Sequence, residues 1–321
     1  MINIVRKIFP SLMSSLNISR SYFYDTIRFI KYNTNNSPLT SEPKSLALLV
    51  RATHGLEKAF SLPKMKSTFG SENAKYLMSM MEHCLKVSGD GEQLRDAAKV
   101  MANYLDYHAT QEGFESLKNR FDTFLSEINI DLNKSSCFKV YDPIVTFDIE
   151  AYTNFILSRH SIRNFKEQII PINRVYDILE LARHTPSACN RQPWKVRLFQ
   201  SMEDIEEVLT IQNGNRGFSS SIHNLILITG DLSNFSSKER NQAYIDGGLY
   251  SMALINAIHA HGLASCALNM SYQSTEERKM RSVLKLQGNE VPIMMLAFGY
   301  PSDGANYCSS TKRSVKDILL N

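Results

Sequence analysis

The residues best suited to binding chemistry form a short basic segment, Arg159-His160-Ser161-Ile162-Arg163. Its two guanidinium groups lie four residues apart, so they come to one side whether the segment is helical or extended. Arginine forks match phosphate oxygens, and the hydroxyl and backbone amide of Ser161 add donors between them. The segment therefore fits a phosphate group, although two arginines on a surface often face only water.

A second polar segment runs from Thr185 to Trp194 and reads TPSACNRQPW. Its two prolines fix the path of the chain, and the small polar residues between them leave amides and side-chain oxygens free to face a ligand. We expect Ser187 and Asn190 to bind something planar and polar. Trp194, the single tryptophan of the chain, is expected to anchor the turn in the core.

The composition limits the kind of protein that carries these segments. Of the 321 residues, 43% are hydrophobic and 21% are charged, which is typical of a globular chain. The 36 basic and 32 acidic side chains give a net charge of +4 with no basic block, so we expect no nucleic-acid partner. The five cysteines are scattered and form no CxxC pair, which argues against a disulfide scaffold and a Cys-rich zinc site, and we expect no metal.

The same sequence holds no continuous apolar stretch of about 18 residues, so we expect no integral membrane segment. Arg6, Lys7 and Pro10 interrupt the apolar residues near the first methionine, where a secretory signal would need a continuous apolar run. A reducing cytoplasm is the simplest compartment for such a chain with unpaired cysteines.

The elements that must position the two segments change character near residues 130–150. Upstream, apolar residues recur at helical spacing over residues 46–56, 77–85, 94–105 and 114–125, which predicts several amphipathic helices. Downstream, helical patterns over residues 152–157, 175–184, 250–261 and 275–284 alternate with strand-like runs over residues 195–199, 225–229 and 293–298. The sequence therefore predicts an α+β domain over residues 145–321 after an all-helical region over residues 1–140.

Taken together, SRHSIRNF and ARHTPSACNRQPW closely resemble the nitroreductase family of FMN-dependent oxidoreductases, in which an R-x-S-x-R segment is followed by P-S-x-x-N-x-Q-P-W. The later segments Asp246-Gly247-Gly248, His261-Gly262-Leu263 and Ala297–Pro301 are compatible with the same family. The resemblance covers about residues 150–321. It implies a nitroreductase-like FMN-binding fold, with an antiparallel-dominated mixed sheet flanked by helices, in an intertwined homodimer with two shared sites.

The resemblance also assigns roles to individual residues. It implies that Arg159, Ser161 and Arg163 hold the phosphate and ribityl chain of FMN. His160 belongs to the same contact segment, and Arg313 and Lys312 would join it from the C-terminus. A second set, Pro186, Ser187, Asn190 and Gln192, would contact the flavin of the other subunit. Leu268 and Asn269 stand where the family presents backbone amides to the flavin ring, although SCALNM departs here from the commoner glycine-containing versions.

The expected activity follows from this resemblance. A reduced nicotinamide, NADH or NADPH, would pass hydride to FMN and then be replaced by a small organic acceptor in a ping-pong scheme, with no catalytic acid or base required. Relatives of the fold also oxidise azolines, remove halogen reductively or fragment the flavin, and a fold alone does not choose among these reactions. A non-catalytic flavin-binding or partner-binding module is the remaining alternative.

The helical region before residue 140 carries one further pair of interest. His54 and Glu57 stand three residues apart in THGLEKAFSLP, so they would meet on one helix face. They could act as an acid–base couple, or form only a structural contact. The helical region as a whole could lengthen the dimer interface, cover the active site or bring a large substrate, and we favour the first two roles.

Overall fold

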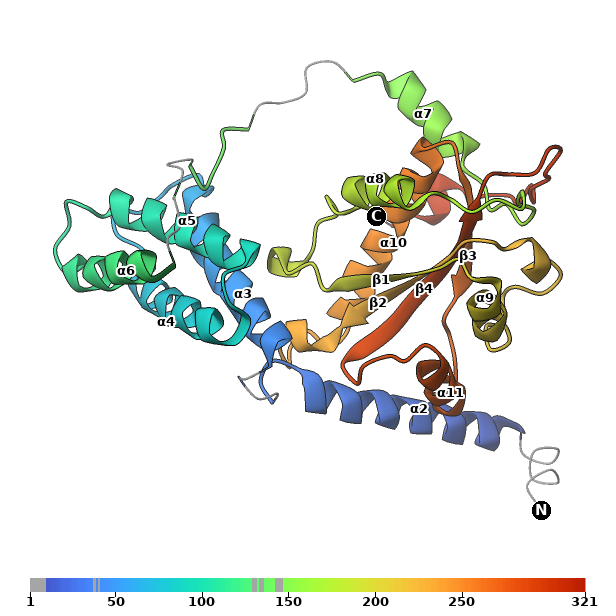
Figure 1. Cartoon of the computed structure of the whole chain (residues 1–321), viewed down its shortest axis with the longest axis horizontal. Helices are drawn as coiled ribbons and strands as arrows, with labels where there is room; N and C mark the ends of the chain where they lie inside the picture. The colour runs from blue at the N-terminus through green and yellow to red at the C-terminus, as the bar shows by residue number, and fades with distance from the viewer. Residues whose placement is uncertain are drawn as a thin grey trace.

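The computed structural model describes residues 10–36, 39, 41–128, 132, 136–141 and 147–320 of the chain. A helical region is followed by a region of mixed helices and strands (Figure 1). The helices are α2 (Pro10–Tyr32), α3 (Glu42–Phe60), α4 (Ser71–Ser88), α5 (Glu92–Tyr107), α6 (Glu115–Ile128), α7 (Ile149–Ser158), α8 (Ile172–Ala182), α9 (Met202–Leu209), α10 (Gln242–Ala260) and α11 (Ser274–Val283). The strands are β1 (Trp194–Phe199), β2 (Leu225–Asp231), β3 (Ala264–Asn269) and β4 (Glu290–Gly299).

Helices α3 to α6 pack into a bundle of their own at one side of the molecule (Figure 1). Their apolar faces meet in one core, in which Leu56, Leu77, Met81 and Tyr104 are fully buried. The Tyr104 hydroxyl donates a 2.6 Å hydrogen bond to the carbonyl of Phe69, so this buried phenol is satisfied. The helices predicted from the spacing of apolar residues are therefore confirmed, because each spacing corresponds to a face turned toward this core.

The second region is built on a four-stranded sheet in the order β1-β2-β4-β3, with β1 and β3 at its two edges. All three strand pairs are antiparallel. Among the described residues, parallel pairing is limited to the isolated bridge between Ser161 and Ser265. The α+β fold class and the antiparallel-dominated sheet are confirmed.

Helices cover both faces of this sheet. Residues of α8 and α10 pack on one face, against Ile226, Ile228 and Phe298, and residues of α9 and α11 pack on the other, against Leu225 and Leu227. Strand β2 alternates between the two layers and is buried along its whole length, as expected for a central strand with both faces covered.

Helix α10 approaches the sheet unusually closely at Gly247. A Cβ atom on Gly247 would lie 2.7 Å from Cγ1 of Ile293 on β4, which is closer than real Cβ contacts. The glycine that follows Asp246 is therefore required by packing, and it fixes the position of the first turns of α10. Gly262, with φ +69°, follows this helix in the left-handed conformation that glycine adopts readily at helix ends.

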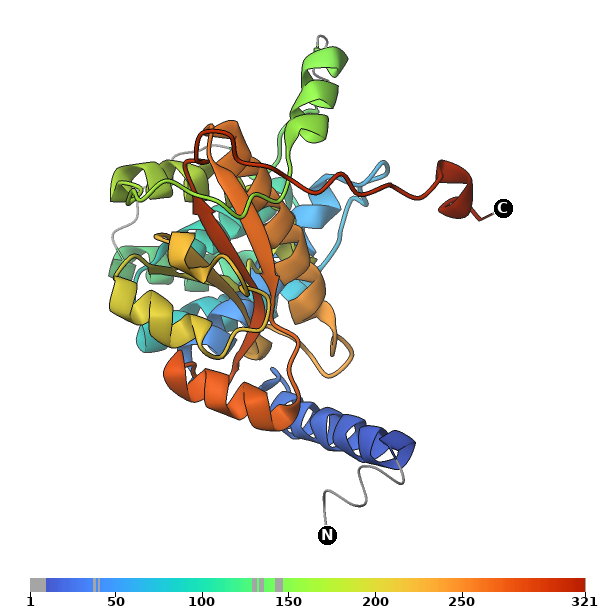
Figure 2. The same cartoon turned by 90° about the vertical axis from the view of Figure 1, so that its right-hand side faces the viewer.

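Helix α2 lies along the sheet region, against α11, and not within the bundle of α3 to α6 (Figures 1 and 2). Its Arg28 forms a 2.8 Å ion pair with Glu277 of α11 and donates to the carbonyl of Glu290 at 2.5 Å. The predicted boundary between residues 140 and 145 falls mostly on residues 142–146, which lie outside the described residues.

Three elements were not predicted individually, namely α2, α9 and the edge strand β3, and α10 begins at Gln242, earlier than the apolar run that starts at Tyr250. None of the helices, as far as they are described, combines the length and apolar character that crossing a membrane requires.

Candidate functional site

The basic segment Arg159–Arg163 follows the end of α7 and runs beside the first residues of the edge strand β3. Ser161 forms a parallel bridge with Ser265, and the amide of Ile162 donates a 3.1 Å hydrogen bond to the Ser265 carbonyl. This pairing holds the backbone of the segment in an extended form. The guanidinium groups of Arg159 and Arg163 therefore project from a fixed backbone at one end of β3.

Neither arginine is neutralised within the described part of the chain. Arg159 is half-buried and Arg163 is exposed, and no carboxylate among the described residues forms an ion pair with either. Arg163 makes one side-chain contact, a 3.8 Å hydrogen bond from Nη1 to Sγ of Cys308. Two unpaired cations beside a fixed backbone can bind an anion.

A cavity of about 430 Å³ opens beside this segment, lined in part by Arg159, His160 and Ser265. The His160 ring stacks on Tyr307, with centroids 3.6 Å apart, and this contact closes one wall of the cavity. Burial and the nearby charge of Arg159 lower the pKa of His259, another lining residue. The structure thus brings three of the predicted residues, Arg159, His160 and Ser161, to one place.

Lys312 and Arg313 lie elsewhere. They belong to the exposed C-terminal segment, which runs away from the body of the molecule (Figure 2). Arg313 donates to the carbonyl of Asp317 within this segment, and no described contact joins either residue to Arg159–Arg163. Within one chain, the C-terminal cations therefore do not reach the basic segment.

The second predicted segment, residues 186–192, forms a tight turn before β1. Its backbone is left-handed at Cys189, Asn190 and Gln192, with φ of 53°, 54° and 48°. Residues with a side chain seldom adopt this conformation, and asparagine adopts it more readily than cysteine or glutamine. The turn therefore stores strain of about 1–3 kcal/mol per residue. The hydroxyl of Ser187 accepts a 3.0 Å hydrogen bond from the amide of Gln192 and closes the turn.

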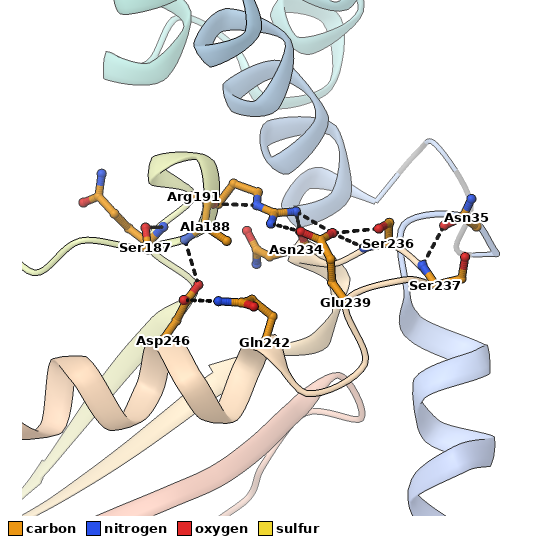
Figure 3. Close-up of polar contacts among 11 residues, drawn as sticks. Asn35, Ser187, Ala188, Arg191, Asn234, Ser236, Ser237, Glu239, Gln242 and Asp246 are labelled. Carbon is orange, nitrogen blue, oxygen red and sulfur yellow. Dashed lines mark hydrogen bonds and ion pairs between the residues drawn. The ribbon is translucent and has the colours of Figure 1, made fainter. Parts of the chain in front are cut away.

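Buried polar contacts hold this strained turn in place (Figure 3). The side chain of Arg191 is 1% exposed and pairs with Glu239 at 2.5 Å, and Arg191 also donates to the carbonyl of Asn234 at 2.6 Å. Burial alone would raise the pKa of Glu239, but hydrogen bonds from Arg191 and Ser236 outweigh it and lower the pKa to about 2. The Glu239 carboxylate is therefore charged at neutral pH and fixes Arg191.

Asp246 anchors the other side of the turn. It is 1% exposed, and its carboxylate accepts hydrogen bonds from the amide of Ala188 at 3.2 Å and from Nε2 of Gln242 at 2.7 Å (Figure 3). The turn is thus held from both sides, while the side chains of Pro186, Asn190 and Gln192 stay exposed. Trp194 stacks on Tyr250 with centroids 4.7 Å apart, in keeping with its expected anchoring role.

Leu268 and Asn269 form the last residues of β3. The Leu268 side chain is buried in the core between the sheet and α9, and the Asn269 carbonyl accepts a 2.9 Å hydrogen bond from Gln212. From Ser265 to Asn269 the strand advances about 13 Å. The basic segment and this pair therefore lie at opposite ends of one edge strand.

The two polar segments lie at diagonally opposite corners of the sheet. Residues 186–192 lead into Trp194, the first residue of the edge strand β1, which pairs with Gly230. Ser161 bridges Ser265 of the other edge strand, β3. Ser265 pairs with Phe298 of β4, whose amide donates to the carbonyl of Asn224, the residue before β2. Six residues along β2 and three strand spacings across the sheet separate the corners by about 25 Å. One chain does not bring the two segments together.

Sequence reasoning missed Arg191 and Glu239, the ion pair that shapes the turn. The only signal in the sequence was an arginine inside a stretch of small polar residues, and its partner stands 48 positions later. It also missed that α3 packs against residues 188–190, which places the helical region next to the turn. In addition, among the described residues no group of three or more His, Cys, Asp or Glu side chains is arranged to hold a metal.

Comparison with known proteins adds sequence similarity to this geometry. Residues 156–215, which contain both polar segments, match the model of the nitroreductase family. Nitroreductase NfnB of Mycolicibacterium smegmatis is 26% identical over 204 residues, in an alignment that covers 49% of this chain and 85% of the relative. The chloronitrobenzene nitroreductase of Comamonas testosteroni is 45% identical over 42 residues, which are 13% of this chain and 18% of the relative.

Solved structures are also similar to this chain. An FMN-dependent nitroreductase from Clostridium difficile covers 53% of this chain and 98% of its own, with 20% identity and a TM-score of 0.45. A nitroreductase-like protein from Streptococcus mutans covers 54% and 98%, with 19% identity and a TM-score of 0.47. The family match and the curated relatives thus show that the part of the chain after the helical region is similar to the nitroreductase family.

Proposed function

We propose that this protein is an FMN-dependent oxidoreductase that takes hydride from NAD(P)H and passes it to a small organic acceptor. The observation that carries the proposal is the presence of both segments of the family's cofactor motif, each fixed by the fold, at opposite corners of one sheet. Because one mononucleotide does not bridge about 25 Å, a complete site needs the basic segment of one copy and the turn of another. The proposal therefore includes a homodimer with two shared sites.

The residues present fit a flavin phosphate. Arg159 and Arg163 have no carboxylate partner among the described residues, so an anion would neutralise them without breaking an existing ion pair. Ser161 and His160 lie in the same fixed segment, and β3 carries Leu268 and Asn269 about 13 Å further along the same edge. These residues would hold the phosphate at one end of the strand and face the ring at the other. Lys312 and Arg313 would add cations to the phosphate from the C-terminal segment of a neighbouring copy.

The exposed face of α10 supports the homodimer. This helix buries Tyr250, Leu254 and Ile258 against the sheet, yet Leu249 and Met252 on its other side are 47% and 44% exposed. Tyr244 and Ile245 extend the same exposed apolar surface. A second copy seated here would remove these side chains from water and stabilise the pair.

The chain's own residues would bind and orient, and a side-chain acid or base is not part of the proposal. FMN, when bound, supplies the ring that accepts and releases hydride. The turn held by Arg191 and Asp246 would present Pro186, Ser187, Asn190 and Gln192 to the cofactor of the other copy without rearranging. A strained turn that is fixed before binding loses little entropy when the ligand arrives.

The visible absorption spectrum of the purified full-length protein tests this proposal. We expect oxidised flavin bands that bleach when NADH or NADPH is added without oxygen, and the faster of the two identifies the reductant. Re-oxidation by a nitroaromatic compound or a quinone would then complete the cycle. A colourless protein that does not take up added FMN would overturn the proposal.

A further inference from the structure

The helical region and the turn at residues 188–192 enclose a cavity of about 550 Å³. Helix α3 supplies His54 and Glu57 to its wall, helix α5 supplies Glu92 and Asp96, and the turn supplies Asn190 and Gln192. A cavity of this size accommodates an organic molecule. Because the proposed flavin-contacting turn forms one of its walls, the cavity adjoins the proposed site.

The charge of this cavity is negative. Glu57, Glu92 and Asp96 bring three carboxylates to the helical wall, whereas the guanidinium of Arg191 is already paired with Glu239. Nδ1 of His54 lies 3.6 Å from Oε2 of Glu57, so the imidazole stands beside one of these carboxylates. In a partly enclosed space, carboxylates of one sign raise the local concentration of cations and lower that of anions.

The opposite wall offers neutral groups that can orient a bound molecule. Nε2 of Gln192 donates to Oδ1 of Asn190 at 3.2 Å, and no hydrogen bond is described for Nδ2 of Asn190 or Oε1 of Gln192. Trp194 and Val50 add apolar surface to the lining. The cavity thus combines an acidic wall, an amide wall and an aromatic side chain, which suits a flat organic body that carries a positive charge.

We infer that this cavity is the acceptor site and that the carboxylates of the helical region make it selective for a positively charged organic acceptor, such as an aromatic ring with an ammonium group. The inference rests on the proposed function and extends it to the substrate class. It also gives the helical region a role, because α3 and α5 would form the wall that recognises the charge.

Three probes that differ mainly in charge test the inference, namely 4-nitrobenzylammonium, 4-nitrobenzyl alcohol and 4-nitrobenzoate. Their binding to the full-length protein, with whatever flavin it carries, is measured by isothermal titration calorimetry, and their reduction is followed separately. We expect the ammonium probe to bind on the order of tenfold more tightly than the carboxylate, and salt at about 0.5 M to remove most of the difference.

Variants locate the selectivity. Glu57→Gln and Asp96→Asn should each weaken binding of the ammonium probe about threefold and leave the alcohol unchanged, since each removes one partly exposed charge. Glu72→Gln is the matched control, because this carboxylate lies on α4, pairs with Lys75 and does not line the cavity. The control should bind all three probes as the parent protein does.

The outcomes separate this inference from the proposed function. If flavin is bound and bleached by NAD(P)H but the ammonium probe binds no better than the carboxylate, the inference is wrong and the proposed function stands. If no flavin binds but the charge preference and the variant effects are present, the cavity stands as a cation-selective site and the proposed function falls. Equal loss of binding in Glu72→Gln and Glu57→Gln would also contradict the inference.

Discussion

The two regions of this molecule differ in how completely they bury their apolar side chains. Between residues 41 and 128, four large apolar side chains are exposed, whereas between residues 147 and 320 nineteen are exposed. The second range is about twice as long, so its length does not account for the difference. The helical bundle is closed around its own core, whereas the sheet region leaves more of its apolar side chains exposed.

The exposed side chains of the sheet region occur on particular elements. They gather on α7, on the outer side of α10 and at the C-terminus, where Val315, Ile318 and Leu319 are all largely exposed. Helix α7 and the C-terminal segment both project from the body (Figure 2). The exposed apolar side chains of the sheet region therefore support the proposed second copy, and the closed bundle is consistent with the proposed wall beside the turn.

The largest expected effect comes from charging the exposed face of α10. Leu249→Arg should convert the proposed dimer into a monomer that has lost FMN, because a guanidinium would be buried in the proposed apolar contact between copies. Light scattering after size exclusion measures the mass. Leu62→Arg, which charges an equally exposed leucine (49%) in the helical region, is the control and should stay dimeric. Equal masses for Leu249→Arg and the parent would contradict the assignment of this face.

A truncation in the core of the helical bundle should act on stability and leave assembly intact. Leu77 is fully buried, so Leu77→Ala should cost about 2–5 kcal/mol of unfolding free energy. Urea unfolding followed by circular dichroism measures the loss. The variant should remain a dimer below its transition, since the proposed dimer surface lies on α10 and Leu77 lies in the core of the bundle. A monomeric but folded Leu77→Ala protein would remove the distinction between the two regions.

Where the two regions meet, the ion pair of Arg191 and Glu239 gives a pH-dependent prediction. The folded-state pKa of Glu239, about 2, lies below its usual value of 4.5, so its contribution is complete above about pH 4.5 and is lost as the pH falls toward 2. Glu239→Gln should cost about 2–4 kcal/mol at pH 7, because it leaves Arg191 buried without a countercharge. The difference in stability between parent and variant should shrink as the pH falls below about 4.5. A difference that stays constant from pH 7 to pH 3 would exclude this carboxylate as its source.

The smallest effect is expected at the proposed phosphate contact. Arg163→Ala should weaken FMN binding by about 1.5–3 kcal/mol, the range for a hydrogen bond to a charged group, without lowering the melting temperature of the apo protein. Equilibrium dialysis against FMN measures the affinity. Lys166→Ala, which removes a cation paired with Asp303 on the surface nearby, is the matched control. Equal FMN affinity in Arg163→Ala and the parent would remove Arg163 from the site.

Periodicity in the sequence predicted two kinds of element, namely helices that bury one face and strands that consist of a continuous run of apolar residues. The helices of the bundle have one buried face each, and β1, β2 and β4 have recognisable apolar runs. Strand β3 escaped because ASCALN is short and made of small residues, and α10 was placed too late because Asp246 and Gly247 are buried at its start for reasons of packing. Local patterns do not report such contacts.

The candidate site could be predicted only in part for a similar reason. The motifs at residues 159–163 and 186–192 are local, so the sequence located both. Their separation across the sheet, the pairing of Arg191 with Glu239 and the approach of α3 to the turn depend on contacts between distant residues. The negative cavity exists only after these contacts form, and no spacing in the sequence indicates it.

Mixing two inactive variants tests most directly the central claim that the site is shared between copies. One copy carries Arg159→Ala with Arg163→Ala, the other carries Ser187→Ala with Asn190→Ala, and each must first be shown to lose FMN as a homodimer. Differently tagged copies are co-expressed and the mixed dimer is purified through both tags. A shared site predicts one FMN per mixed dimer, because one of its two sites combines the intact basic segment with the intact turn. A mixed dimer without FMN, beside a parent dimer that binds two, would contradict the account.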